Sequence, residues 1–201
     1  MIIVDLDDTV LDTRGSLRLV KLEEAARLAP RTRDVLLARA REHRSGRALI
    51  GDACAAFDVD EETEALMVAA YYENHPADFV VPLIEGAREA LESWRERGFR
   101  IVCVTAGDEG QQRAKIENAN LDFDEVIVVS EPQDKALVYD RIMEDPHRTV
   151  VIGDKLSDVR PALDLGARAI LFAAPIDAWD GPCTTSWREV CRIVDELFIE
   201  A

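Results

Sequence analysis

The chain has 201 residues, which is enough for one domain carrying an insertion or for one medium and one small domain. It contains 40 acidic and 24 basic residues, giving a net charge of −16 at pH 7. Phosphate-rich surfaces are bound by stripes of lysine and arginine, and the chain shows no basic stripe. This charge therefore excludes binding to a nucleic-acid polymer or to an anionic membrane.

The amino-terminal sequence and the cysteines bear on where the protein resides. Met1-Ile-Ile-Val4 passes directly into Asp5 with no signal peptide, and no apolar stretch approaches membrane-spanning length. We therefore expect a cytoplasmic protein. The cysteines lack a Cys-x-x-Cys spacing, so we expect buried small side chains rather than disulfides or zinc ligands at Cys54, Cys103, Cys183 and Cys191.

The apolar run at residues 1–4 predicts a buried strand, and it is followed by the acidic sequence Asp5-Leu-Asp7-Asp-Thr9. Residues i and i+2 of an extended chain point the same way, so Asp5 and Asp7 can converge beyond the strand tip. Two carboxylates held there repel each other unless a cation or a proton neutralises one of them. A divalent ion, a covalent nucleophile or an acid/base pair would explain them; an acidic turn after an edge strand is the alternative.

After Thr9 the next strand-like run begins only at Phe99, too far away for a single crossover helix. The intervening residues predict helices. The first is capped by Ser16 and stopped by Pro30, and the others lie at about 32–44, at about 48–57 and after Asp60. An all-helical insertion at residues 14–82 is therefore predicted.

From Gly86 onward helices and strands alternate, which is typical of a parallel sheet. A helix with apolar residues at Ala87, Ala90, Leu91 and Trp94 ends at Gly98. The predicted strands then lie at 99–104, 126–129, 149–152 and 169–172. Predicted helices lie at 110–118, 134–144, from Ser157 and at 186–198.

Polar and small residues follow two of these strands. Thr105-Ala-Gly107 follows the second strand and Gly153-Asp154 the fourth, with Asp158 four residues further on and Lys135 in between. Ligand sites of open parallel sheets form outside the carboxyl ends of the strands. The three strand tips, including the one that carries Asp5 and Asp7, are expected to meet at one place.

Taken in order, these four elements resemble the signature of the haloacid dehalogenase-like superfamily. That signature is Asp-x-Asp-x-Thr, then Thr or Ser, then Lys, then Gly-Asp-x-x-x-Asp, and the resemblance runs from residue 1 to about 172. It implies an α/β fold: a Rossmann-like parallel sheet core with helices on both faces, plus an all-helical cap domain. The core would comprise residues 1–13 and 83–201 and the cap residues 14–82, placed where this superfamily carries its helical cap.

The resemblance also implies a phosphatase that acts on a small soluble phosphorylated metabolite. Asp5 would be the nucleophile that forms an aspartyl-phosphate, and Asp7 the general acid and then the general base. Mg²⁺ would be held by the carboxylates of Asp5 and Asp154 and by the carbonyl oxygen of Asp7. Asp158 would orient metal-bound waters or the lysine.

The remaining motif residues would bind phosphate. Thr105 and the backbone N–H groups of Ala106 and Gly107 would hold phosphate oxygens at a helix start. Lys135 would place a positive charge between the nucleophile and the phosphoryl group.

The lysine of the third motif is open to an alternative. In many relatives a proline follows this lysine, whereas Ala136 follows Lys135 here. A surface role for Lys135 is one alternative, and Lys155, inside the fourth motif, is another candidate for the active-site lysine. Lys115 lies late in the preceding predicted helix and is a poor candidate.

Two other functions stay open on these residues. A phosphosugar mutase of the same superfamily keeps the same aspartates, and a non-catalytic regulator could keep the metal- or phosphoryl-binding fold. Dehalogenase activity is disfavoured, because that chemistry needs no acid/base carboxylate at the position of Asp7.

Overall fold

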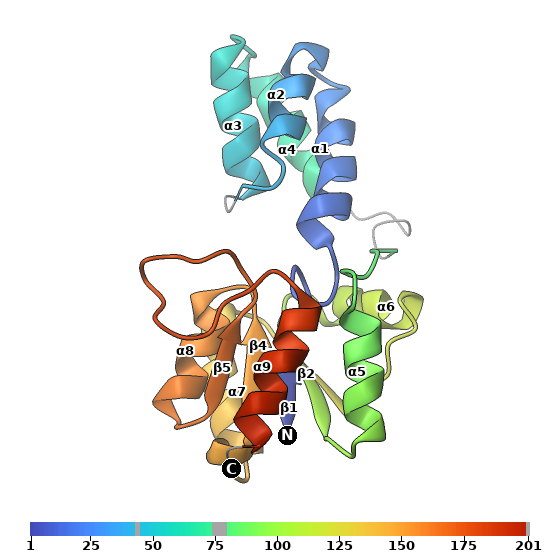
Figure 1. The fold of residues 1–201 in the computed structure, drawn as a ribbon. Helices are drawn as coiled ribbons and strands as arrows, with labels where there is room; N and C mark the ends of the chain where they lie inside the picture. Colours follow the sequence, from blue (N-terminus) through green and yellow to red (C-terminus); the bar gives the residue numbers. More distant parts are fainter. Residues whose placement is uncertain (43–44, 74–79, 200–201) are drawn as a thin grey trace. The chain divides into compact units, whose positions relative to one another are not determined.

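The computed structural model describes residues 1–42, 45–73 and 80–199, and the chain divides into two compact units (Figure 1). One unit comprises Met1–Leu11 and Leu83–Ala201, and the other comprises Asp12–Pro82. Among the described residues, no helix is long and apolar enough to cross a membrane.

The larger unit is built on a five-stranded sheet in which all neighbouring strands run parallel. In order across the sheet, the strands are β3 (Glu125–Val129), β2 (Ile101–Ala106), β1 (Ile2–Val4), β4 (Val150–Gly153) and β5 (Arg168–Leu171). The register places Val4 opposite Cys103 on β2 and Ile152 on β4. The predicted parallel sheet is therefore confirmed, with the first strand of the chain at its centre.

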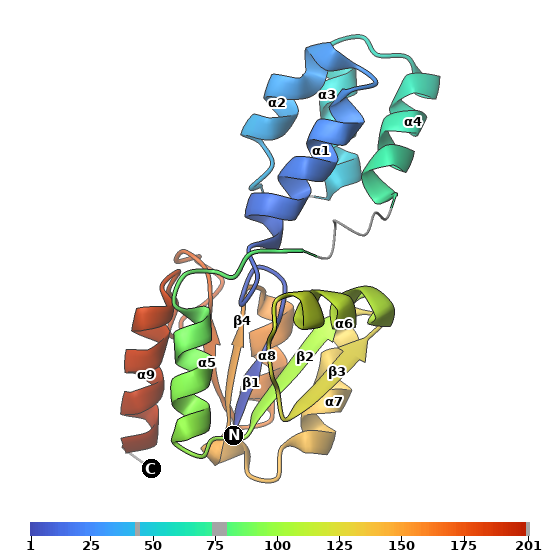
Figure 2. The ribbon, with the colours of Figure 1, turned by 90° about the vertical axis from the view of Figure 1, so that its right-hand side faces the viewer.

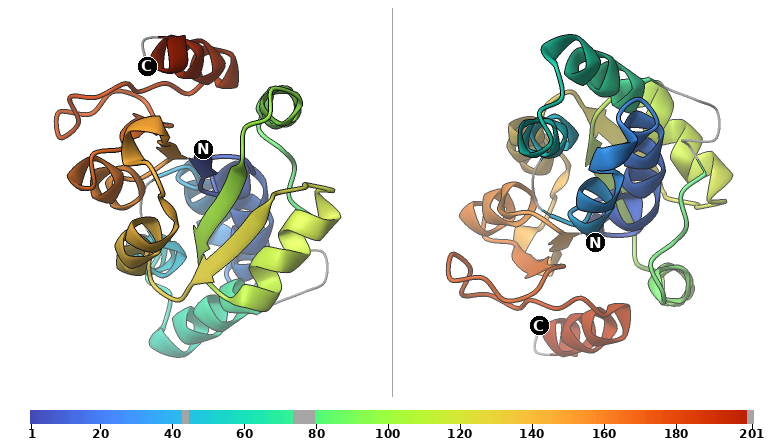
Figure 3. Two further views of the ribbon diagram at one scale, coloured as in Figure 1. Left: turned by 90° about the horizontal axis from the view of Figure 1, so that it is seen from below. Right: turned by 90° about the horizontal axis from the view of Figure 1, so that it is seen from above.

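Helices cover both faces of this sheet (Figure 2; Figure 3). On one face lie α5 (Ala87–Glu96) and α9 (Trp187–Ile199), and on the other lie α7 (Lys135–Ile142) and α8 (Leu156–Asp164). Helix α6 (Glu109–Asn118) packs beside β3. The Rossmann-like arrangement predicted from the alternation of strands and helices is confirmed.

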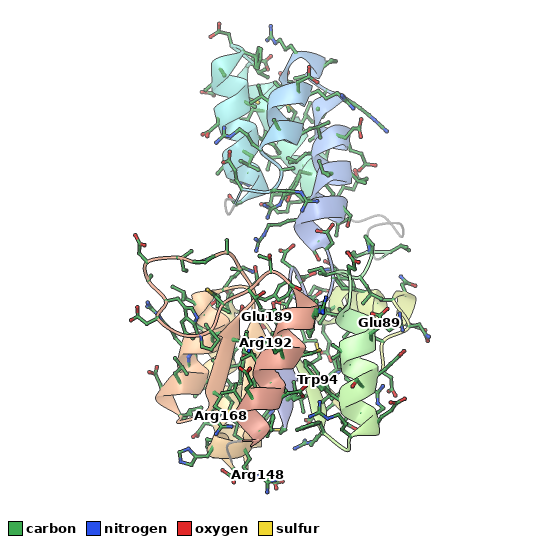
Figure 4. The ribbon with its side chains drawn as sticks, viewed as in Figure 1. Glu89, Trp94, Arg148, Arg168, Glu189 and Arg192 are labelled. Carbon is green, nitrogen blue, oxygen red and sulfur yellow. The ribbon has the colours of Figure 1, made fainter. Side chains whose placement is uncertain are left out.

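Alternate residues of the central strands pack on opposite sides of the sheet. Towards α7 and α8, Ile3 and Val151 join a buried cluster that includes Tyr139 and Val159. On the other face, α5 and α9 meet through aromatic rings. Trp94 of α5 (Figure 4) lies 5.8 Å from Trp187 of α9 between ring centroids. The ring of Phe172 lies 5.6 Å from that of Trp187.

The smaller unit is helical throughout its described residues. It contains the π-helical turn η1 (Thr13–Leu17), α1 (Arg18–Ala26), the 3-10 turn η2 (Pro30–Thr32), α2 (Arg33–Ala38), α3 (Gly46–Ala56) and α4 (Glu61–Tyr72). Its own apolar core is formed by residues from all four α-helices, among them Leu22, Leu36, Leu49, Ile50 and Met67. The predicted helical character of this segment is thus present in the structure.

Two predicted details of the helical segment are wrong. Asp12, not Ser16, caps its first helix: the Asp12 carboxylate accepts a hydrogen bond from the Gly15 N–H at 3.0 Å. The Ser16 hydroxyl instead donates to the Asp12 carbonyl. The helix predicted at 32–44 ends at Ala38, and residues 43–44 lie outside the described part of the chain.

The cysteine prediction is only half right. All four cysteines are free thiols, as expected. Cys54 and Cys103 are buried, whereas Cys183 and Cys191 are partly exposed.

Trp187 connects α9 to the loop that follows β1. Its side chain is 1% exposed, and its indole N–H donates to the Thr9 carbonyl at 2.9 Å.

We expect Trp187→Ala to lower the free energy of unfolding by about 3–5 kcal/mol, because it leaves a large cavity. Trp187→Phe should cost less, because it keeps the aromatic contacts. Urea denaturation followed by circular dichroism measures both. The matched control is Leu137→Ala, at a residue that is 76% exposed, where a change above about 0.5 kcal/mol would be unexpected.

Candidate active site

The carboxyl ends of three adjacent strands bring the predicted motifs together. Asp5 follows β1, Thr105 lies near the end of β2, and Asp154 follows β4. Because β1 lies between β2 and β4 and all three run parallel, these ends lie at one edge of the sheet. The Asp5 N–H donates to the Ile152 carbonyl at 2.9 Å, so the backbone of Asp5 is still held by the sheet.

Lys135 lies at the centre of this edge. Its side chain is 2% exposed, and its Nζ lies 2.7 Å from Asp5 Oδ1 and 2.7 Å from Asp158 Oδ1. The short 3-10 turn Pro132–Asp134 leads directly into Lys135 at the start of α7 and positions it there. The structure therefore brings Lys135, and not Lys155, to the nucleophile candidate.

Burial and neighbouring charges shift the pKa of Asp5 in opposite directions, and the same is true of Lys135. Burial raises the pKa of the Asp5 carboxyl to about 6, although the adjacent Lys135 ammonium opposes the rise. Burial alone would lower the pKa of Lys135, but the carboxylates of Asp5 and Asp158 outweigh it and raise that pKa. Lys135 is thus held as a permanent cation beside Asp5.

Three buried carboxylates make this edge suitable for a hard cation. Three carboxylate oxygens lie within 4.8 Å of one another, one each from Asp5, Asp154 and Asp158. Such a set of oxygen donors suits Mg²⁺, which is bound in proteins by one or two carboxylates together with waters and substrate phosphate. The residues present therefore fit the ion. The expected ligand from Asp7 was its carbonyl oxygen, and this remains a prediction.

Asp158 is fixed by the backbone around it. Its Oδ2 accepts a hydrogen bond from the Lys155 N–H at 2.9 Å, while its Oδ1 faces Lys135. A Cβ added at Gly153 would lie 2.4 Å from the Asp158 Cβ, so glycine is required where Asp158 packs over the end of β4. The side chain of Lys155 is 51% exposed, with its Nζ 3.7 Å from Asp154 Oδ1.

The second motif differs from its prediction in one respect. Thr105 is buried near the end of β2, and its role in binding phosphate remains a prediction. The Gly107 N–H, however, donates to the Val129 carbonyl at 2.9 Å. The prediction that this N–H binds phosphate is therefore wrong, because β3 already occupies it. Gly107 has a φ of +145°, a conformation that favours glycine.

Asp7 lies against α6, a contact that the sequence does not indicate. Lys115 Nζ lies 2.9 Å from Asp7 Oδ1 and 3.0 Å from Oδ2. Gln112 Nε2 lies 2.9 Å from Asp7 Oδ2 and 3.0 Å from Thr105 Oγ1. Lys115 was a poor candidate for the third-motif lysine, and Lys135 lies at Asp5 instead, but the contact of Lys115 with Asp7 was not predicted. The spacing of three residues places Gln112 and Lys115 on one face of the helix, but nothing in the sequence indicates that this face meets Asp7.

Comparisons with known proteins show what the chain as a whole is similar to. The family model for haloacid dehalogenase-like hydrolases matches residues 1–166. A phosphoglycolate phosphatase from Nitrosospira multiformis is 27% identical over 190 residues, covering 87% of this chain and 82% of the relative.

Solved structures share the fold at lower identity. A candidate β-phosphoglucomutase from Thermotoga maritima superimposes with a TM-score of 0.72 at 20% identity, covering 97% of this chain and 98% of that one. A haloacid dehalogenase-like family hydrolase from Xanthomonas campestris has a TM-score of 0.63 at 23% identity, covering 97% and 95%.

Removing one carboxylate should expose the metal dependence of the site. We expect Asp154→Ala to weaken Mg²⁺ binding by about 100-fold or more, because the ion tolerates little error in its few protein ligands. Asp158→Ala should act more mildly, through Lys135. Calorimetric titration with MgCl₂ measures both variants. An unchanged affinity in Asp154→Ala would show that the fourth motif is assigned wrongly.

The two candidate lysines can be separated by activity. Lys135→Ala should lower kcat by about 100-fold or more, because it removes a buried cation beside the reacting carboxylate. Lys155→Ala is the matched control and should change kcat by less than about 5-fold, because an exposed ammonium is screened by water. Thermal unfolding of both variants separates loss of chemistry from loss of fold. The reverse order of activities would place the third motif at Lys155.

Proposed function

Since this chain belongs to the haloacid dehalogenase-like hydrolase family, we propose that it is a magnesium-dependent phosphomonoester hydrolase. Its substrate would be a small soluble phosphorylated metabolite, and the reaction would pass through an aspartyl-phosphate on Asp5. The observation that carries the proposal is the buried contact of 2.7 Å between Lys135 Nζ and Asp5 Oδ1, beside the carboxylates of Asp154 and Asp158.

Phosphoryl transfer needs a nucleophile, neutralisation of charge and a proton for the leaving group. In the proposed first step an oxygen of Asp5 attacks phosphorus, the ester P–O bond breaks, and protonated Asp7 gives its proton to the leaving oxygen. The Lys135 ammonium neutralises charge at the attacking carboxylate. The Thr105 hydroxyl donates to a phosphoryl oxygen.

The second step returns the enzyme to its starting state. The Asp7 carboxylate takes a proton from water as the water oxygen attacks phosphorus. The bond between phosphorus and Asp5 then breaks, which releases inorganic phosphate. Mg²⁺, held by Asp5, Asp154 and the Asp7 carbonyl, would supply positive charge for the phosphoryl oxygens in both steps.

The size of the substrate follows from the second unit. Helical residues 12–82 are inserted between β1 and the rest of the core, and we assign them the role of a cap that excludes water during the reaction. A capped site favours compact ligands over phosphoproteins. The similarity to a phosphoglycolate phosphatase supports a small phosphomonoester.

A phosphosugar mutase is the second candidate, because it keeps the same aspartates. The structural similarity to a candidate β-phosphoglucomutase is one of fold and does not separate the two reactions. Release of phosphate does separate them, since a mutase returns the phosphoryl group to the sugar.

We expect the protein to release phosphate from sugar phosphates and other small phosphomonoesters in the presence of MgCl₂, and to lose this activity in EDTA. Asp5→Asn should abolish turnover while preserving the fold, because it removes the nucleophilic charge and keeps the shape. The matched control is Asp108→Asn, in which the exposed cap of α6 keeps its capping oxygen. A colorimetric assay of free phosphate measures the activity of the wild-type protein and of both variants. The substrates are a panel of small phosphorylated metabolites and one folded phosphoprotein.

Three results would contradict the proposal. Substantial activity in purified Asp5→Asn would exclude the aspartyl-phosphate. Faster turnover of the phosphoprotein would exclude the small-molecule class. Isomerisation of a phosphosugar without release of phosphate would favour the mutase.

A further inference from the structure

The inner face of α6 is polar where a packed helix usually carries apolar side chains. Gln112 is 2% exposed and Lys115 is 8% exposed, and both point at Asp7. On the same helix Arg113 faces solvent and pairs with Glu109 at 3.0 Å. Burying an ammonium and an amide costs free energy unless each finds a polar partner, so this face is organised around the Asp7 carboxylate.

The contacts hold both oxygens of that carboxylate. Lys115 Nζ reaches Oδ1 and Oδ2 at 2.9 and 3.0 Å, and Gln112 Nε2 reaches Oδ2 at 2.9 Å. Three contacts from two nitrogen atoms therefore fix the position and the plane of the Asp7 carboxylate. The side chain of Asp7 is 22% exposed, so it is not closed off by these contacts.

Gln112 also connects Asp7 to the second motif. Its Nε2 lies 3.0 Å from Thr105 Oγ1 and 2.9 Å from the Ala106 carbonyl. Three acceptors around one atom identify it as the nitrogen of the amide. The buried Gln112 Oε1 has no hydrogen-bond partner among the described residues. Leaving it unpaired costs free energy, and this cost accompanies the orientation that turns Nε2 toward the three acceptors. Because Thr105 Oγ1 accepts from Gln112, its own hydrogen stays available for a phosphoryl oxygen.

We propose that Lys115 and Gln112 are positioning residues that hold the Asp7 carboxylate for proton transfer to the leaving oxygen. The inference rests on the proposed function. As Asp7 gives up its proton and the ester P–O bond breaks, negative charge develops on its carboxylate. A preorganised ammonium at 2.9 Å stabilises that charge as it forms. In the second step the same contacts aim the carboxylate at the attacking water.

The dependence of the rate on the leaving group tests this role. An alkyl phosphomonoester needs a proton on its leaving oxygen, whereas p-nitrophenyl phosphate leaves as a stable anion and needs little help. We expect Lys115→Met to lower kcat/KM, which reports only the steps up to departure of the leaving group, by about 10- to 100-fold for the alkyl ester and by less than about 3-fold for p-nitrophenyl phosphate. Lys115→Arg should restore part of the loss. Arg113→Met, on the solvent face of the same helix, is the matched control.

A double-mutant cycle provides the second readout. If Lys115 acts through Asp7, then adding Lys115→Met to Asp7→Asn should lower kcat for the alkyl ester no further than Asp7→Asn alone. If Lys115→Met fails to fold, Gln112→Met provides a second test, because it keeps the Lys115 ammonium. Gln112→Met should also slow the alkyl ester more than p-nitrophenyl phosphate, but by a smaller factor than Lys115→Met. Thermal unfolding reports the fold of each variant.

The outcomes separate this inference from the proposed function. Equal losses of kcat/KM on both substrates, additive effects in the cycle, or an unchanged kcat/KM on the alkyl ester would overturn the positioning role while hydrolysis itself stood. A wild-type protein that releases phosphate from neither substrate would instead overturn the proposed hydrolysis, and turnover that survives in Asp5→Asn would overturn its aspartyl-phosphate step.

Discussion

The contact of one buried ammonium with two buried carboxylates underlies the rest of this site. Lys135 lies between Asp5 and Asp158 at 2.7 Å from each, and all three are almost fully buried. Without the cation, carboxylates gathered at one sheet edge would repel one another in a poorly solvated place. Because Asp5 follows β1, Lys135 begins α7 and Asp158 lies in α8, the same contact that neutralises the site also joins a strand to two helices.

The fold follows from the sequence to the extent that burial dictates residue type. β1 and β4 are buried on both faces, so they appear as continuous apolar runs with Asp5 and Asp154 directly after them. Parallel strands end at one edge, so the meeting of these residues could be anticipated without coordinates. Helix α6, predicted at 110–118, spans Glu109–Asn118 because Asp108 caps it. A cap is a local signal, so the start of this helix could be anticipated from the sequence.

The remainder depends on contacts that no local pattern encodes. Lys115 and Asp7 are 108 residues apart, and α6 has no apolar stripe to show which face meets the sheet. The Gly107 N–H appears free until the pairing of β3 with β2 is known, since the Val129 carbonyl accepts its hydrogen bond. Ser16 and Asp12 are both good caps, and only the backbone selects Asp12.

The central position of β1 has a consequence for the order of assembly. The first strand leaves the ribosome long before its neighbours, which begin at Ile101 and Val150. β1 can pair only after both neighbouring strands have been made. The long chain segments between β1 and these strands must then close into loops, which makes folding slow. The helices of residues 12–82 pack on one another and can form while β1 waits. Vectorial synthesis would thus complete the helical unit first, and the sheet edge that carries Asp5 and Asp154 would form only after α8 has been made.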